Sequence, residues 1–182
     1  HIVIANPHFL YQYNKQHVRF DQMTAGGFPL LDKPLAFNIW RAPTDNDRNI
    51  RLQWSEFGYD RIIPRGYETT VTMQDGACVL TTRFSIGAIF LPNILTGTAE
   101  YKINTNGTID VNIKGNRREC APALPRFGLR MFMPERLDDV TYFGYGPYES
   151  YNDKHRASVK HLYSAKVDEL HEGFDVLRSR VA

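Results

Sequence analysis

One stretch of the chain organises the rest: Phe37-Asn38-Ile39-Trp40-Arg41-Ala42-Pro43-Thr44-Asp45-Asn46-Asp47-Arg48. A short apolar run is followed by an arginine, a proline and three oxygen-bearing side chains. Pro43 has a fixed φ angle and pushes the residue before it towards an extended conformation, so we expect the strand holding residues 37–40 to end there. Residues 45–47 suit a turn whose side chains bond to nearby backbone N–H groups. The planar guanidinium of Arg41 suits pairing with these carboxylates.

Two motifs carry a resemblance to a known family. The first is Trp40-Arg41-Ala42-Pro43-Thr44-Asp45-Asn46-Asp47, and the second is Tyr142-Phe143-Gly144-Tyr145-Gly146-Pro147-Tyr148-Glu149-Ser150-Tyr151-Asn152-Asp153. Both are similar to signatures in the last domain of large bacterial β-galactosidases of glycoside hydrolase family 2, the small chain of two-chain members. They occur in the same order as in that family, with strand-like segments between them.

Length, charge and cysteine usage narrow the class of protein. A chain of 182 residues suits one domain with a real core, and 42% hydrophobic content is ordinary for a globular protein. A net charge of +2 gives no electrostatic case for nucleic acid or membrane, and no long apolar run indicates a membrane span. Cys78 and Cys120 lack metal-ligand spacing, and we expect both to be buried small hydrophobes. His1 in place of an initiator methionine indicates a start inside a larger chain.

Strand-like segments recur along the chain, with turn signals between them. The expected strands cover residues 8–13, 18–20, 67–73, 78–84, 100–103, 109–113, 126–133, 140–145 and 159–167. Asp75-Gly76 and Asn106-Gly107 are hairpin signals. Residues 86–95 are apolar but broken by a glycine and a proline, which predicts a loop or an irregular edge. Apolar side chains on both faces after Arg130 predict that strand 126–133 is buried between two layers.

One short helix is expected near residues 49–58. Asn49 is the expected N-cap, and Gly58 is expected to end the helix. Ile50, Trp54 and Phe57 recur on one face, and we expect this face to pack against the sheet rather than stack on a sugar. The alternating residues Phe9, Tyr11 and Tyr13 are likewise expected in the core rather than on a sugar-binding surface.

The pattern as a whole is that of an all-β antiparallel sandwich. The resemblance implies the two-sheet supersandwich that is akin to galactose mutarotase. Residues 1–172 match that domain, which we expect to be incomplete at its C-terminus. Residues 173–182 are expected to be a divergent or truncated tail, because a Pro-Gln-Glu-Asn-Gly-like segment and further strands should follow there. The resemblance also implies that the part of the family domain expected beyond this tail carries a tryptophan that reaches the galactose site.

The candidate site residues fall into two groups. Trp40, Arg41, Pro43, Asp45, Asn46 and Asp47 are expected to form a structural or domain-docking motif, with Arg41 bonding to the second motif as a further expectation. Capping and turn bonds explain Asp45 and Asp47 better than catalysis does. The candidates to face carbohydrate are Glu149, Tyr151, Asp153 and His155, although a structural role is favoured for the two acids. No calcium-loop or histidine metal spacing is present, so no metal site is expected.

The resemblance implies a function for the parent rather than for this segment. Glycoside hydrolysis needs two carboxyl groups facing each other across the sugar, and in the family both belong to a preceding barrel, so no catalytic residue is assigned here. The parent would hydrolyse terminal β-D-galactosides with retention, and this segment would shape the active-site mouth and support assembly. No cofactor is expected in the segment, whereas the family often uses Mg and Na bound elsewhere. The expected partners are the catalytic barrel, the galactoside through the parent and, as an open alternative, further copies.

Two alternatives stay open on the sequence alone. One is a free-standing carbohydrate-binding or mutarotase-like sugar epimerase domain, which would need a histidine and a carboxylate converging on a sugar pocket. The other is a purely structural domain that binds no small molecule. The compartment is left open, with the cytoplasm favoured over the periplasm.

Overall fold

The computed structural model describes residues 1–147, 156 and 158–170. The chain divides into two compact units, His1–Met133 and Pro134–Ala182, which are described separately. Among the described residues, no helix has the length and apolar character needed to cross a membrane.

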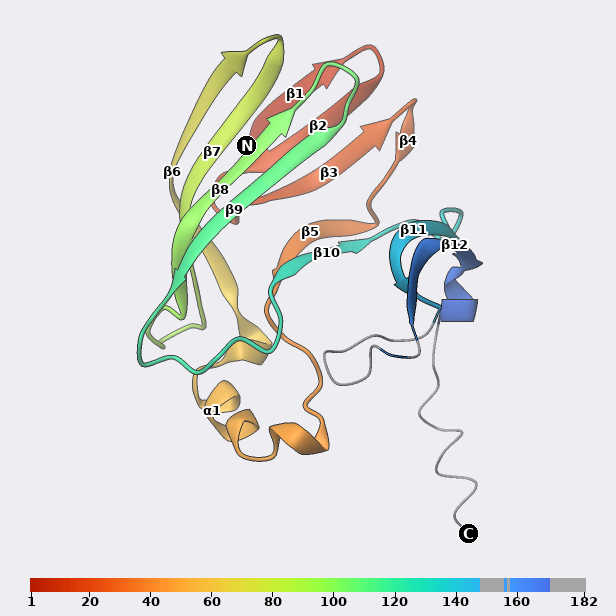
Figure 1. Ribbon diagram of the computed structural model, residues 1–182. Helices are drawn as coiled ribbons and strands as arrows, with labels where there is room; N and C mark the ends of the chain where they lie inside the picture. Colours follow the sequence, from red (N-terminus) through yellow and green to blue (C-terminus); the bar gives the residue numbers. More distant parts are fainter. Residues whose placement is uncertain (148–155, 157, 171–182) are drawn as a thin grey trace. The chain divides into compact units, whose positions relative to one another are not determined.

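The first layer of unit 1 is an antiparallel sheet near the N-terminus. It contains β1 (Ile2–Asn6), β2 (Phe9–Asn14), β3 (Arg19–Ala25) and β4 (Phe28–Pro29) in that order. Next comes β5 (Lys33–Asn38), which contacts β3 and pairs antiparallel with β10 (Gly128–Phe132), a strand far along the chain (Figure 1). The strand of the organising stretch thus joins distant parts of the sequence.

The second layer is a four-stranded antiparallel meander. It contains β6 (Ile63–Gln74), β7 (Ala77–Gly87), β8 (Leu95–Ile103) and β9 (Ile109–Arg117). Asp75 and Gly76 take φ angles of 50° and 81°, as the predicted two-residue hairpin requires. The Asn106-Gly107 turn is also confirmed. Most of the segment predicted as a loop, residues 88–94, does connect β7 to β8.

Aromatic side chains from both layers pack together in one core. The ring centroids of Tyr13 and Tyr101 lie 5.6 Å apart, and those of Phe37 and Phe84 lie 5.0 Å apart. Phe9, Tyr11 and Tyr13 are buried, which confirms that this stripe belongs to the core. Burial follows from the period-two alternation of β2, which turns every second side chain towards the facing sheet.

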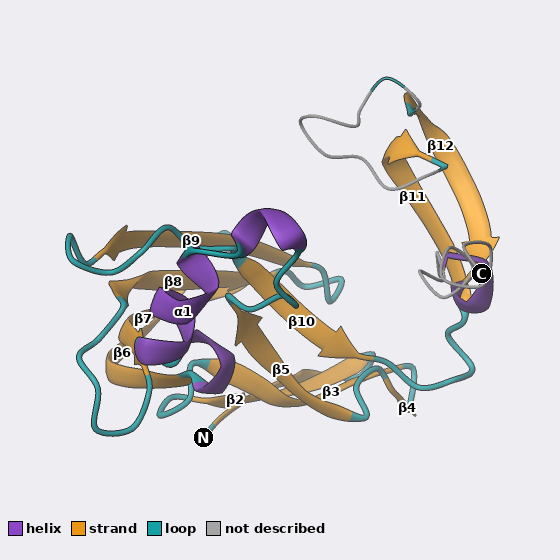
Figure 2. Ribbon diagram, turned by 90° about the horizontal axis from the view of Figure 1, so that it is seen from below, coloured by secondary structure: helices purple, strands orange, loops and turns teal. Residues whose placement is uncertain are grey.

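The predicted helix lies at one end of the sandwich (Figure 2). Helix α1 covers Ile50–Glu56 and is flanked by the short 3-10 helices η1 (Asp45–Asp47) and η2 (Tyr59–Arg61). Gly58 ends it in the left-handed conformation, with a φ angle of 70°, as predicted. Asn49 stands at the N-cap position, but its backbone is helical and its side chain makes no cap bond, so that part of the prediction is wrong. The preceding η1 turn already brings the chain into helical geometry there.

Three further expectations need correction. The strand of the organising stretch ends at Asn38, before the proline-imposed corner. Strand β10 is not buried on both sides: Met131 and Met133 are 52% and 46% exposed, because β10 lies outside β5 and no second layer of unit 1 covers it. Cys120 is exposed and Cys78 only half-buried, since Cys120 lies in the irregular connector after β9.

Unit 2 contains a two-stranded antiparallel hairpin. It pairs β11 (Asp139–Gly146) with β12 (Val159–Lys166), followed by the 3-10 helix η3 (Val167–Leu170). The Tyr142 and Tyr163 rings stack at 5.4 Å, and the Tyr163 hydroxyl donates to the Gly146 carbonyl at 2.8 Å. Both predicted strands, 140–145 and 159–167, are therefore confirmed apart from Val167, which begins η3.

Candidate functional site

The predicted polar corner is built around the carboxylate of Asp47. Arg41 donates to it through both terminal nitrogens, Nη1 to Oδ2 at 2.5 Å and Nη2 to Oδ1 at 3.0 Å. The backbone N–H of Thr44 donates to Oδ2 at 2.8 Å and its hydroxyl donates to the same oxygen at 3.0 Å. The residue types of the motif follow from this geometry: the proline turns the chain so that a planar fork and a short carboxylate meet.

The electrostatics of the corner favour the charged form of Asp47. The hydrogen bond from Arg41, followed by the bond from the Thr44 backbone, lowers the pKa of Asp47 to about 2. Asp47 is buried, whereas Asp45 and Asn46 are exposed. The predicted pairing with Arg41 therefore falls to Asp47, the last acid of the motif.

Two tryptophans hold the corner against the helix. The Trp40 and Trp54 rings meet edge to face at 6.3 Å, and the Arg41 guanidinium lies 5.6 Å from the Trp54 ring centroid. Trp54 is 2% exposed, and its indole N–H donates to the Ala123 carbonyl at 2.8 Å. Trp54 thus packs inside the domain, as the helix pattern predicted.

A groove of about 780 Å³ opens beside the corner. Residues 126–131 line one side of it, and Asn38, Trp40, Arg41 and Ala42 line the other. Sequence reasoning missed this groove because it arises where β5 pairs with β10, some ninety residues apart on the printed sequence. The only signal in the sequence was the pair of arginines, Arg126 and Arg130, on either side of Gly128.

A second groove lies on the four-stranded sheet. It has a volume of about 430 Å³ and contains Tyr67, Arg83 and Phe84 in its lining, together with residues 96–98 and Asn116. Neither groove is lined by an aspartate or a glutamate. A pair of facing carboxyl groups, which glycoside hydrolysis needs, is therefore absent from both of these grooves.

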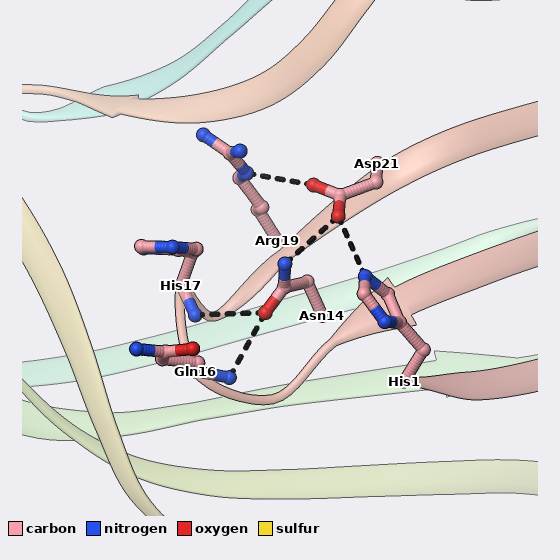
Figure 3. Close-up of polar contacts among 6 residues, drawn as sticks. All are labelled: His1, Asn14, Gln16, His17, Arg19 and Asp21. Carbon is pink, nitrogen blue, oxygen red and sulfur yellow. Dashed lines mark hydrogen bonds and ion pairs between the residues drawn. The ribbon is translucent and has the colours of Figure 1, made fainter.

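A polar cluster ties the start of the chain to the β2–β3 turn (Figure 3). The Asn14 side-chain oxygen accepts from the backbone N–H groups of Gln16 and His17, at 3.0 and 3.1 Å. Asp21 accepts from Asn14 at 2.8 Å and from Arg19 at 2.8 Å, and it lies 2.9 Å from the His1 ring nitrogen. These contacts join the ends of β2 and β3 and the turn between them to one another, an arrangement typical of a turn brace.

The remaining site predictions lie outside the described residues. These are Glu149, Tyr151, Asp153 and His155, together with the tail at 173–182. The expected bond between Arg41 and the second motif would join the two separately described units, and it stays a prediction. Within the described ranges, no three histidine, cysteine or acidic side chains gather in a way that could hold a metal ion.

Comparison with known proteins assigns the chain to a family. Residues 5–176 match the family model described as the β-galactosidase small chain. A β-galactosidase of Actinobacillus pleuropneumoniae is 39% identical over 173 residues, which is 95% of this chain and 17% of that protein. A β-galactosidase of Staphylococcus xylosus is 33% identical over 144 residues, covering 79% of this chain and 14% of its own length. The chain thus spans about a sixth of the length of these relatives.

Proposed function

The chain belongs to the β-galactosidase small-chain family, and from that premise we propose that it is a non-catalytic β-sandwich part of a longer β-galactosidase. The parent would hydrolyse terminal β-D-galactosides with retention. This segment would form one wall of the active-site mouth and support assembly. One observation carries the proposal: a chain that matches relatives along 95% of its own length covers only 17% of theirs.

The chemistry of the described residues favours a structural role for the signature over a catalytic one. Retaining glycosidases place two carboxyl groups about 5–5.5 Å apart, one as the acid and one as the nucleophile. The buried acid of the signature, Asp47, is held ionised by Arg41 and by two bonds from Thr44, so its lone pairs are already engaged. A carboxylate in this state suits a fixed corner and does not suit proton transfer.

The proposed role of the corner is to hold a rigid wall. Trp40, Arg41 and Asp47 form one connected group with the buried Trp54, so the segment between β5 and α1 is braced on both sides. A braced segment of this kind can present a constant surface to a neighbouring domain or a substrate.

A complementation experiment tests this function. The chain is mixed with the β-galactosidase of A. pleuropneumoniae from which the matched region has been deleted, and hydrolysis of a chromogenic β-galactoside is followed. We expect no hydrolysis by either part alone and restored hydrolysis by the mixture, because the carboxyl pair and the wall then come together. Hydrolysis by this chain alone would overturn the proposal, as would a mixture that stays inactive while the two parts bind each other.

A titration separates the proposed wall from an independent sugar-binding module. Galactose and lactose are added to the chain alone while the tryptophan fluorescence is recorded. The proposed role predicts a flat response, since the wall acts only beside the rest of the parent. A saturable response would favour the carbohydrate-binding alternative.

A further inference from the structure

The second groove lies on the face of the four-stranded sheet that is turned away from the core. Phe84 marks the core face, because its ring stacks on that of Phe37 at 5.0 Å. Its neighbours in β7, Arg83 and Ser85, therefore point to the opposite, outer face. Residues paired directly across strands share a face, which adds the polar partners of these two positions on β8 and β9: Thr98, Thr96 and Asn116.

A β-bulge brings Tyr67 onto the same outer face. The register of β6 against β7 shifts between Gly66 and Glu68, so Tyr67 is an extra residue in its strand. Its hydroxyl lies 2.9 Å from the hydroxyl of Ser85, a residue that is 2% exposed. Bulges commonly re-aim a side chain beside a binding or active site. Here the bulge places an aromatic ring over the polar side chains of the groove, and Tyr67 is part of the lining.

The ring of Tyr67 is exposed and yet held in one orientation. It is 52% exposed, its hydroxyl bonds to the buried Ser85, and the Arg65 guanidinium lies 5.8 Å from its centroid. A ring that is fixed before a ligand arrives loses little conformational entropy on binding. Such a ring suits a ligand that stacks on it, and the C–H face of a sugar ring is a ligand surface of this kind.

The charge of the groove is set by Arg83. This side chain is exposed, and no described carboxylate lies within ion-pair distance of it. Lys114 stands opposite Thr98 on the same face, and Glu68 stands opposite Arg83, but both lie outside the lining. The lining itself contains no acid. A guanidinium in this setting suits a carboxylate or a sulfate, which it can bind through two parallel N–H groups.

We propose that this groove is a binding site for an acidic saccharide, meaning a sugar ring that carries an anionic group. The ring stacks on Tyr67, the anionic group pairs with Arg83, and the sugar hydroxyls bond to two hydroxyls and an amide of the sheet, those of Thr96, Thr98 and Asn116. The volume of about 430 Å³ lies in the range of small-molecule sites. Tyr67 is the one exposed ring of the lining, which favours a sugar over a nucleobase held between two rings.

A matched pair of disaccharides tests the proposal. Digalacturonic acid and galactobiose of the same linkage differ by carboxylates in place of hydroxymethyl groups, and each is titrated into the isotope-labelled chain while backbone amide signals are recorded. We expect digalacturonic acid to shift the signals of residues 83, 96–98 and 116. It should bind at least about tenfold more tightly than galactobiose, because Arg83 pairs with a carboxylate. Equal binding of the two, or no shift up to the solubility limit, would overturn the proposal.

Two further probes separate the saccharide from other anions. Inorganic phosphate carries a charge without a ring, and uridine monophosphate carries a charge with a base. Both should shift the same signals more weakly than digalacturonic acid does, because neither offers a sugar ring that carries its own carboxylate. Tighter binding of phosphate or of the nucleotide would assign the groove to that ligand and discard the saccharide.

Variants locate the bound sugar. R83Q should weaken the binding of digalacturonic acid at least about tenfold and leave galactobiose unchanged, because it removes only the charge pair. Y67A should weaken both disaccharides, whereas Y67F keeps the ring and should retain most of the affinity. The matched control R126Q removes an equal charge from the first groove and should leave binding unchanged. Equal losses in R83Q and R126Q would contradict the assignment. Circular dichroism of each variant shows that the fold is intact.

The test is independent of the proposed function. Restored hydrolysis in the complementation experiment without binding of the acidic disaccharide would retain that function and discard the saccharide site. Binding confined to the groove supports the site whether or not hydrolysis returns. The fluorescence titration with neutral sugars reports on something else, since no tryptophan lines this groove.

Discussion

At the scale of single residues, the corner shows how one carboxylate can define a turn. Asp47 takes two bonds from Arg41 and two from Thr44, and its neighbours in the motif stay in solvent. Four donors around one carboxylate stabilise its charge, and this stabilisation links the folding of the corner to pH.

The stability of unit 1 should depend on pH through Asp47. Its pKa is about 2 in the folded chain against an ordinary 3.8, so the ionised form contributes stability that is complete above about pH 5 and is lost as the pH falls from about 4 to 2. The difference in pKa corresponds to about 2 kcal/mol. D47N should therefore be about 2 kcal/mol less stable than the wild type at pH 7 and nearly equal to it at pH 2, as urea unfolding measures.

A neighbouring acid supplies the control for that experiment. Asp45 lies in the same turn but is exposed, so D45N should change the unfolding free energy by less than about 0.5 kcal/mol at either pH. If D47N and D45N behave alike, the corner does not depend on the paired carboxylate.

A second residue-scale prediction concerns the buried hydroxyl of Tyr101. This is the one buried side-chain polar atom without a hydrogen-bond partner among those described, and burial raises the pKa of Tyr101. Removing an unpaired polar atom from a core relieves its desolvation cost. Y101F should therefore be as stable as the wild type or more stable by up to about 1 kcal/mol in urea unfolding.

Tyr13 provides the matched contrast within the same core. Its hydroxyl lies 2.8 Å from the Thr82 hydroxyl, and Thr82 lies 3.0 Å from the Thr69 hydroxyl. Y13F should cost about 0.5–1.5 kcal/mol, because it removes a bond inside a satisfied chain of hydroxyls. A larger loss in Y101F than in Y13F would show that Tyr101 has a partner after all.

At the scale of elements, the sheets depend on places where two backbones lie in close contact, as well as on strand pairing. Strands β8 and β9 come so near at Gly97 that a Cβ atom there would lie 2.2 Å from the Lys114 carbonyl oxygen. Trp54 of α1 bonds to the Ala123 carbonyl and Tyr59 of η2 to the Pro122 carbonyl at 2.7 Å, so the connector after β9 is held by the helical segment. The irregular connector is therefore fixed by side chains rather than by a ladder.

A pair of glycine substitutions tests the element-scale packing. G97A should lower the free energy of unfolding by about 1–3 kcal/mol, because the backbone of β9 must shift to admit the methyl group. G128A should be neutral or slightly stabilising, because the new methyl group meets open space and the unfolded chain loses freedom. Equal effects of the two changes in urea unfolding would contradict the described packing.

At the scale of the molecule, the buried apolar cluster of the described residues lies within unit 1. Every residue of the buried apolar cluster and of the partly buried side chains around it lies between Ile2 and Leu129. A two-stranded hairpin such as that of unit 2 is marginal in water by itself, whereas two packed sheets bury enough apolar surface to fold. Among the described residues, the two packed sheets of unit 1 are therefore the part of the chain most able to fold by itself.

A truncation tests the independence of unit 1. Residues 1–133 alone should unfold in one cooperative urea transition and keep a near-ultraviolet circular dichroism spectrum, because the core cluster is intact. A broad transition with loss of the near-ultraviolet signal would show instead that unit 1 needs further chain to order its core.

The sequence by itself determined most of the local structure. In the polar corner it also determined that Arg41 pairs with an acid of the same motif. Alternation and turn chemistry predicted the strands, the Asp75-Gly76 hairpin and the inward stripe of Phe9, Tyr11 and Tyr13, because these depend on nearby residues. The pairing of Arg41 with an acid of the motif was predictable for the same reason. Local patterns also identified the family, since both motifs are continuous in the chain.

Only the tertiary structure decided features that join distant residues. It left β10 at an exposed edge and opened the groove where β10 meets β5. Within the local corner, it also decided which acid pairs with Arg41, namely Asp47 and not Asp45. It also paired Trp54 with a carbonyl 69 residues away. A hydrophobic pattern states that a side chain prefers burial, but the surface that covers it depends on which strands pair, and pairing is a property of the whole fold.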